Sequence, residues 1–328
     1  MGIPATTYNN LARPTGVTKR RSSPRRGSLK IRRTRSRDRF FWYSASDGVS
    51  RLVNSNNSIP EQVNNYSFAP SEFHHEAYPK TFPVGGVWPP QQIDDLVFAT
   101  GSENTDCVGD TCYNGNICED LDCTHTLAAW KAATSDWEKH FELRKTEHRG
   151  IGVYTRHAFR QGAILGWYAG ELKTLASMDG SKSDYLMEIE IGDISPHTPL
   201  EPTPSIYIDG EHKGNWTRFI NHSCAADCVF RIMRVGNTRI MAVEAIKDIP
   251  RGKELSVDYG EQYYGLTTKK RCACGVPECV ERRRIRLEKA MERRKTAEKA
   301  MERRKTAEKA KRNGNIKRCR RVAPPILV

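Results

Sequence analysis

The sequence has no run of apolar residues long enough to cross a membrane, and its N-terminus lacks the apolar segment of a secretory signal. Hydrophobic residues make up only 38% of the 328 positions, and the mean hydropathy is −0.67. This composition favours one folded unit with long solvated flanks over two large cores. We therefore expect no membrane span, and a reducing compartment in which cysteines do not form disulfides.

Acidic residues are scarce at both ends of the chain. Residues 1–40 hold 12 Lys or Arg against the single acid Asp38, and residues 281–328 hold 19 against six. The two arms therefore carry +11 and +13, and the whole-chain charge of +14 leaves −10 for residues 41–280. This distribution predicts an acidic body between two basic arms, which we expect to bind DNA and to direct nuclear import.

Neither arm has the composition of an independent domain. Residues 19–39 are rich in Arg and Ser and nearly free of acids, so they cannot bury enough apolar surface to fold. In the other arm, "EKAMERRKTA" occurs at 288–297 and again at 298–307. These residues favour helix, but a ten-residue period drifts around a helix of about 3.6 residues per turn and leaves no continuous apolar seam. We expect a solvated basic helix there rather than a coiled coil.

The opening "MGIPAT" fits the loose pattern for myristoylation at Gly2, with Thr6 at the required place and basic residues behind it. Pro4 is an awkward residue inside that pattern. A membrane-anchored basic adaptor is therefore one alternative to a nuclear protein, and cell fractionation with a Gly2→Ala control separates the two.

Seven of the ten cysteines fall into two groups that are spaced like metal ligands. The first has the spacing C-x4-C-x5-C-x4-C (Cys107, Cys112, Cys118, Cys123), and the second has the spacing C-x-C-x4-C (Cys272, Cys274, Cys279). Without disulfides, such groups usually bind zinc, and a structural zinc site takes four ligands. The second group is one ligand short, and Cys224 is the natural candidate to complete it. The alternative is that both groups are ordinary free thiols.

Between the two cysteine groups the sequence alternates short strands and turns. Segments rich in β-branched and aromatic residues, separated by Gly, Pro, Asn or Asp, occur at 150–155, 163–172, 185–191, 206–210, 229–235, 239–246 and 254–260. Only residues 124–141 look helical in this region. The pattern predicts a mainly β core with few helices, too few for a doubly wound parallel sheet.

Five sequence blocks follow one another in an order that resembles a known family. They are "RGIGVYT" (149–155), "YAGEL" (168–172), "GNWTRFINHSC" (214–224), "ELSVDYG" (254–260) and "CACGVPEC" (272–279). Together they resemble the SET domain of lysine methyltransferases followed by its cysteine-rich post-SET segment. The resemblance implies the SET-domain (β-clip) fold, in which the segment 214–224 threads under the loop that carries "DYG" in a knot-like arrangement.

The resemblance covers roughly residues 140–280 and divides the chain into six parts. The cysteines at 107–123 are only loosely similar to the zinc modules that precede some SET domains. The parts are a basic disordered arm (1–40), a poorly defined linker (41–106), a candidate pre-SET-like zinc module (107–123), the SET domain (140–265), the post-SET zinc segment (270–282) and a basic repeat helix or tail (283–328).

The resemblance also implies roles for particular residues. The cofactor S-adenosylmethionine is expected to lie against Gly150, Gly152, Tyr154, Arg218, Phe219, Asn221 and His222. The catalytic residues are expected to be Tyr259, whose hydroxyl faces the reacting amine and methyl group, and Tyr185. The substrate channel is expected to include Tyr168 and Val257. The zinc ligands of the post-SET segment are expected to be Cys224, Cys272, Cys274 and Cys279.

The sequence departs from the family pattern at two of these places. Trp167 stands where the family usually has Glu, and Val257 stands where it generally has Phe or Tyr. Because Val is smaller and has no hydroxyl to hold a water, di- or trimethylation is sterically easier here than a strict stop at one methyl group.

Taken together, these features predict a zinc-containing histone-lysine N-methyltransferase of the nucleus and chromosome. The acidic body suits a basic histone tail, with H3 favoured, and we expect a monomer. The sequence does not identify the lysine that is modified. The alternative is a catalytically inactive SET-fold protein that binds chromatin, but Asn221, His222 and Tyr259 are all present, as an active enzyme requires.

Overall fold

The computed structural model describes residues 39–54, 58–74, 87–99, 106–109, 113, 117–120, 123–178, 183–191 and 205–320, the last eight as backbone only. The N-terminal arm with Gly2, the end of the C-terminal arm, and Cys112 lie outside these ranges. The first unit of the chain (Met1–Asp38) is thus not described, and everything below concerns the second, which begins at Arg39.

The described chain is mainly β, as the sequence predicts. Its strands are β1 (Trp42–Ser44), β2 (Ser50–Leu52), β3 (Glu61–Gln62), β4 (Phe141–Lys145), β5 (Ile151–Thr155), β6 (Ile164–Trp167), β7 (Gly170–Lys173), β8 (Leu186–Glu190), β9 (Ser205–Gly214), β10 (Asn221–His222), β11 (Cys228–Val235), β12 (Thr238–Ala245) and β13 (Ser256–Val257). Each segment that reads as a strand from its β-branched and aromatic residues contains at least one of them.

Helices are few and mostly short. They are α2 (Asp94–Val97), α3 (Leu127–Ala133), α4 (Glu261–Tyr264) and α5 (Val280–Arg320), together with the 3-10 turns η1 (Pro70–Phe73), η2 (Trp137–Lys139), η3 (Ala176–Met178) and η4 (Trp216–Phe219). The stretch 124–141 is helical only in part, because Thr134, Ser135 and Asp136 form a turn after α3 in which Thr134 donates its hydroxyl to the Trp130 carbonyl.

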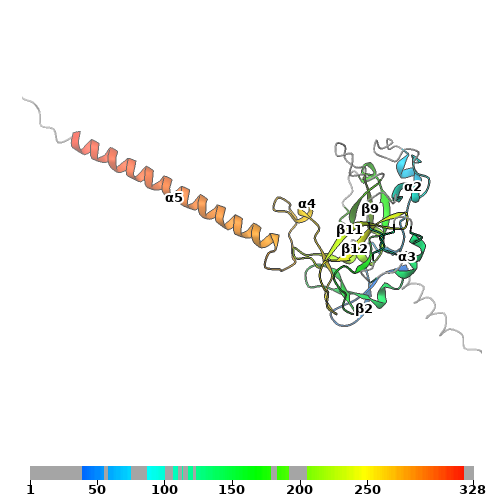
Figure 1. Cartoon of the computed structure of the whole chain (residues 1–328). Helices are drawn as coiled ribbons and strands as arrows, with labels where there is room; N and C mark the ends of the chain where they lie inside the picture. Colours follow the sequence, from blue (N-terminus) through cyan, green and yellow to red (C-terminus); the bar gives the residue numbers. More distant parts are fainter. Residues whose placement is uncertain are drawn as a thin grey trace, which may run out of the picture. The chain divides into compact units, whose positions relative to one another are not determined.

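The strands form several small sheets rather than one. Their orders are β2-β1-β4-β5, β11-β12-β6, β3-β9-β7 with β8 also paired to β9, and the two-stranded pair β10-β13. Figure 1 shows β9, β11 and β12 within this β body. The hairpin β11-β12 turns at Gly236, whose φ of 55° is the left-handed conformation that tight hairpin turns require. The parallel pair β10-β13 brings residues 221–222 and 256–257 side by side.

Two hydrophobic clusters fill the body. One surrounds the buried rings of Trp130 and Trp167, and the other stacks Phe141 on Trp216 with ring centroids 4.3 Å apart. The second cluster includes Trp216 and Phe219 of η4 and the following Ile220, so it anchors the Arg-Phe-Ile-Asn-His-Ser-Cys segment in the core.

The segment 41–106 differs from the expected poorly defined linker. Phe41, Val53 and Tyr66 are each no more than 2% exposed, β1 pairs with β4, and β3 pairs with β9. Sequence patterning misses this because the apolar residues are scattered among polar ones and their partners lie far along the chain. The described parts of this segment are therefore integral to the β body.

The helix α5 begins at Val280, immediately after the last cysteine of the second group, and continues through both ten-residue repeats (Figure 1). Arg284, in its first turns, is 6% exposed and donates to the Gly265 carbonyl at 2.5 Å. From residue 285 to residue 312 every side chain is exposed, which agrees with the expected solvated basic helix. None of the described helices has the length and apolar character needed to cross a bilayer.

Candidate active site and cysteine clusters

A cavity of about 750 Å³ opens beside the segment that carries Asn221. Cavities of about 300–1,000 Å³ are typical of small-molecule sites. Most of the lining comes from residues that are distant in sequence, at 149–151, 184–187, 217–221, 229–230, 258–259 and 263–264. The cavity thus lies where four of the five sequence blocks converge in space, those at 149–155, 168–172, 214–224 and 254–260.

The turn η4 buries Arg218 in the wall of this cavity. Asn215 caps the turn by accepting the Thr217 amide at 3.2 Å. Arg218 is only 5% exposed; it donates to the Gly210 carbonyl at 2.6 Å and lies 4.0 Å from the centre of the Tyr185 ring. Burial lowers the pKa of Arg218, but a guanidinium remains charged at neutral pH. The cavity therefore has a fixed cation stacked against one of its tyrosines.

Asn221 is held by a carboxylate that the sequence analysis did not single out. Its side-chain amide donates to the Ile151 carbonyl at 3.2 Å and to Glu254 at 2.9 Å. The same carboxylate accepts from Arg149 at 2.7 Å and from the Tyr154 hydroxyl at 3.2 Å. Arg149 and Glu254 are the first residues of the blocks "RGIGVYT" and "ELSVDYG". Their places in these blocks were the sequence signal that could have identified them as site residues. This network fixes the Asn221 amide at the cavity wall.

Tyr259 is held at both of its ends. Its backbone amide donates to Nδ1 of His222 at 3.1 Å, and its hydroxyl donates to the Ile220 carbonyl at 2.6 Å. Burial raises the pKa of Tyr259, so the hydroxyl stays protonated at neutral pH. Tyr259 lines the cavity, whereas His222 does not and instead places Nε2 3.3 Å from Sγ of Cys224. His222 therefore connects Tyr259 to the second cysteine group.

Four more tyrosines line the same cavity. The Tyr168 hydroxyl donates to the Tyr185 carbonyl at 2.7 Å, and burial raises the pKa of Tyr168. Tyr263 and Tyr264, on α4, were not anticipated; their ring centroids lie 5.2 Å and 6.1 Å from that of Tyr259. The sequence signal was the aromatic pair that closely follows "DYG". Together the rings make an aromatic wall of the cavity.

Gly150 and Gly152, both expected at the cofactor site, require glycine for different reasons. Gly150 lines the cavity and has a φ of 76°, a conformation that glycine adopts without strain. Gly152 lies outside the lining, and a Cβ there would come within 2.5 Å of the Glu254 carboxylate. Tyr154 also lies outside the lining, since its hydroxyl turns to Glu254 and its ring packs under Arg144. Gly152 and Tyr154 therefore support the Asn221 network from behind.

Three further sequence-based expectations can be placed. Phe219 lines the cavity and packs edge-on against Phe41. Val257 has no exposed surface and belongs to the core beneath the cavity rather than to its lining. Trp167 is also fully buried, and its indole donates to Asn64 at 2.9 Å. The Trp at the family's usual Glu position thus contacts the segment around residue 64, away from the cavity.

The second cysteine group comes together with Cys224. The four sulfur atoms lie within 4.8 Å of one another, and the Cys224 and Cys272 sulfurs are 3.8 Å apart. Zinc–sulfur bonds of about 2.3 Å in a tetrahedron put sulfurs about 3.8 Å apart. The Val280 amide also points at the Cys224 sulfur from 3.4 Å. The arrangement has the donor set and spacing of a closed structural zinc site, made by Cys224, Cys272, Cys274 and Cys279.

Three cysteines of the first group come together with a histidine that the sequence analysis did not name. Ligand atoms of Cys107, Cys118, Cys123 and His125 lie within 4.8 Å of one another, whereas Cys112 is outside the described residues. His125 was missed because a count of cysteines already gave a complete set of four. Its proximity to Cys123 in a Cys-x-His pair was the sequence signal.

Residues 150–260 match the family model described as "SET domain". This range contains most of the cavity, Asn221, His222 and Tyr259, and it identifies this part of the chain as a SET domain. The chain therefore contains a SET domain, and the four-cysteine cluster that follows it is consistent with a post-SET zinc site.

The chain is similar to curated members of that family over part of their length. It is 26% identical over 202 residues to "Histone-lysine N-methyltransferase, H3 lysine-36 specific" of Mycosarcoma maydis, covering 58% of this chain and 20% of that protein. It is 33% identical over 162 residues to "Histone-lysine N-methyltransferase, H3 lysine-9 specific KMT1" of Fusarium mangiferae, covering 42% of this chain and 46% of that protein. This chain therefore spans less than half of either relative.

Among solved structures, the methyltransferase domain of human histone-lysine N-methyltransferase SETMAR is 26% identical, with a TM-score of 0.36. The alignment covers 43% of this chain and 56% of that one.

Proposed function

We propose that this protein transfers methyl groups from S-adenosylmethionine to a lysine side chain of a histone tail, with H3 favoured. The observation that carries the proposal is the fixed Tyr259 hydroxyl, in the same cavity as the Asn221 amide. The SET domain at residues 150–260 and the histone substrates named for both relatives support it.

The residues of the cavity fit the cofactor. Gly150 has no side chain, so the cofactor can approach its backbone at the cavity wall. Arg149 and Lys145 would supply positive charges suited to the carboxylate of the cofactor. Asn221 and Arg218 would supply further polar contacts, and the Phe219 ring would supply apolar surface. When bound, S-adenosylmethionine would supply a methyl group for a neutral amine to attack, with the thioether S-adenosylhomocysteine as the leaving group and the amine proton passing to water.

The remaining chemistry is the preparation of that amine. A lysine in water has a pKa of about 10.4, and burial in a channel next to a positive charge lowers it. The rings of Tyr185, Tyr259 and Tyr263 would exclude water around the substrate lysine side chain. Backbone carbonyls would accept hydrogen bonds from its amine. Because the Tyr259 hydroxyl stays protonated, we assign it to positioning rather than to proton removal.

We propose that the site can add two or three methyl groups. The Val257 side chain ends in the core and is not part of the cavity lining, so no side chain from this position narrows the space around the amine. The consequence is a product distribution that proceeds beyond monomethyl-lysine when the enzyme is in excess.

The charge distribution supports a nuclear protein that acts on chromatin. Residues 41–280 carry −10, which complements a basic histone tail, and the arms suit nucleosomal DNA. We further propose a monomer, with zinc at Cys224, Cys272, Cys274 and Cys279 pinning the segment that precedes α5. The two relatives are named for different lysines of H3, lysine 36 and lysine 9.

The proposal is tested by incubating the full chain with isotope-labelled S-adenosylmethionine and whole nucleosomes, followed by mass spectrometry of all histones. We expect label on lysine of a histone tail, including di- and trimethyl states. A chain that binds nucleosomes but leaves no label on histones or on other nuclear proteins would instead be the inactive chromatin-binding protein.

A further inference from the structure

We propose that Cys107, Cys118, Cys123 and His125 bind a second zinc ion, with His125 rather than Cys112 as the fourth ligand. The proposal is independent of methyl transfer, because it concerns a cluster on the segment that precedes the SET domain. It replaces the four-cysteine set that the spacing alone favours.

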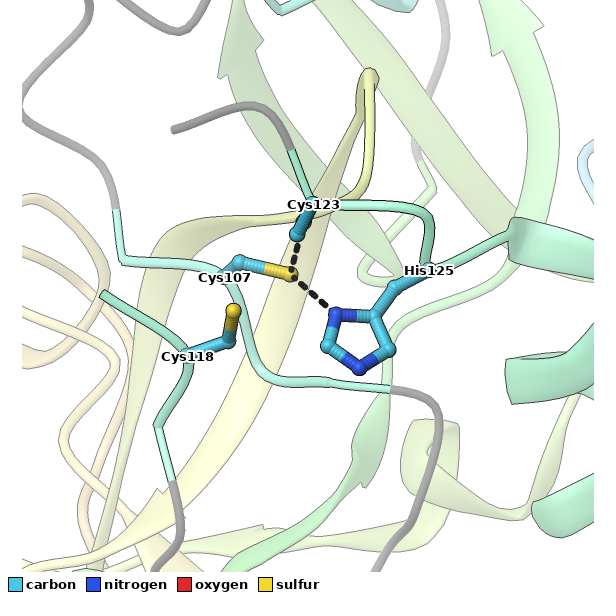
Figure 2. Close-up of side chains that lie close together, drawn as sticks. All are labelled: Cys107, Cys118, Cys123 and His125. Carbon is cyan, nitrogen blue, oxygen red and sulfur yellow. Dashed lines mark hydrogen bonds between the residues drawn. The ribbon is translucent and has the colours of Figure 1, made fainter. Parts of the chain in front are cut away.

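The geometry of the cluster fits a Cys3His zinc site. Figure 2 shows the four side chains converging, with the Cys107 sulfur contacting both Cys123 and His125. The Cys107 and Cys123 sulfurs are 3.5 Å apart, and the Cys107 sulfur lies 3.6 Å from Nδ1 of His125. Tetrahedral zinc with bonds of about 2.3 Å to sulfur and about 2.0 Å to nitrogen requires separations of about 3.8 Å and about 3.6 Å. Binding zinc therefore needs only small movements.

The surroundings of the cluster suit a metal bound by thiolates. Zinc with three thiolates and a neutral imidazole has a net charge of −1. The Arg234 guanidinium, on a residue only 1% exposed, donates to the Cys123 sulfur from 3.6 Å and to the Asp120 carbonyl from 3.1 Å. The Gly236 amide points at the Cys107 sulfur from 3.4 Å. Such outer contacts orient the ligands and balance the charge of a metal site.

The cluster joins a separate segment to the SET core. The Val108 amide donates to the Arg234 carbonyl at 2.9 Å, and the Arg234 amide donates to the Asp106 carbonyl at 3.1 Å. At the turn of the β11-β12 hairpin, a Cβ on Gly236 would come within 2.0 Å of the His125 carbonyl. The residue after His125 is Thr126, which caps α3. Zinc here would join Cys107, Cys118, Cys123 and His125 to one another beside the β11-β12 hairpin, and would fix the start of α3.

The test measures the number of zinc ions bound per chain, in the purified full chain and in its variants, by elemental mass spectrometry. The two clusters predict two zinc ions per chain for the wild type. His125→Ala should retain one and Cys224→Ser should retain one, because each removes a ligand from a different site. Cys112→Ser is the matched control and should retain two. His125→Cys should also retain two, since a thiolate can replace the imidazole.

The outcomes decide between the two ligand sets. Loss of one zinc ion in Cys112→Ser would overturn the proposal, and so would retention of both zinc ions in His125→Ala. A wild type that binds only one zinc ion, and loses that ion in Cys224→Ser, would also overturn it. If His125→Ala fails to fold and loses both ions, the comparison of His125→Cys with Cys112→Ser still decides.

A second measurement needs no variant. Cadmium-113 NMR of the wild type loaded with cadmium should give two resonances, one typical of four sulfur ligands and one displaced toward lower chemical shift by a nitrogen ligand. Two resonances of the four-sulfur type would contradict the Cys3His site.

Discussion

The network around Glu254 gives a prediction whose size follows from the structure. In Glu254→Gln the side chain keeps its shape but presents one oxygen where the carboxylate presents two. Its amide must then face either the Asn221 amide, 2.9 Å away in the present structure, or Arg149, 2.7 Å away. Whichever way the amide turns, a donor meets a donor, and a charge-assisted hydrogen bond is lost.

The expected loss is about 2 kcal/mol of unfolding free energy. Hydrogen bonds to charged groups contribute about 1.5–3 kcal/mol, and we take the lower part of this range because the Arg149 side chain is 24% exposed and can be hydrated. For a domain of this size the melting temperature should fall by about 4–8 °C. Because Asn221 loses its fixed orientation, the Kd for S-adenosylmethionine should rise by about tenfold, which corresponds to about 1.4 kcal/mol.

Calorimetry measures both the melting temperature and the Kd for S-adenosylmethionine on one preparation. The matched control is Asp136→Asn, which breaks an ion pair with Lys139 whose side chains are 63% and 74% exposed, and which should change neither melting nor cofactor binding. If Glu254→Gln melts and binds S-adenosylmethionine like the wild type, the network does not position Asn221 and the reasoning is wrong.

Two further predictions concern the zinc site that contains Cys224 and the two basic arms. Cys224→Ser should lose methyl transfer as well as one zinc ion, because His222, two residues earlier, holds the Tyr259 amide; full activity in a zinc-depleted variant would contradict this link. Removal of residues 1–40 and 286–328 should abolish binding to DNA at low salt while leaving transfer to a free histone peptide largely intact, since the cut retains Arg284. A trimmed chain that binds DNA with the same salt dependence as the full chain would show that the arms are not the DNA-binding elements.

The sequence predicted those parts of the structure that local patterns encode. The strands follow from runs of β-branched and aromatic residues. The grouping of Cys224 with Cys272, Cys274 and Cys279 follows because those three cysteines need a fourth ligand to make a structural zinc site. The five blocks predicted the SET fold, which the family match confirms. These features depend on residue types and spacing alone, so a single chain is enough to read them.

Other features depend on contacts between distant segments, which spacing cannot show. The packing of Phe41 and Tyr66 into the body, and the role of Glu254 as the acceptor that holds Asn221, arise only when β1, β3 and β5 find their partners. Val257 illustrates the same limit: its position in the sequence indicated the substrate channel, whereas its side chain lies in the core.

The most direct test of the central claim is single-turnover methyl transfer by Tyr259→Phe, measured beside its affinity for S-adenosylmethionine. The change removes one hydroxyl that donates to the Ile220 carbonyl at 2.6 Å, so folding should survive with a loss of about 1 kcal/mol. We predict that transfer to histone lysine falls by at least about 10²-fold while the cofactor Kd changes by less than about threefold. Unchanged transfer in a folded variant would contradict the assignment of Tyr259, and absence of transfer by the wild type to any histone or nuclear protein would contradict the proposed activity itself.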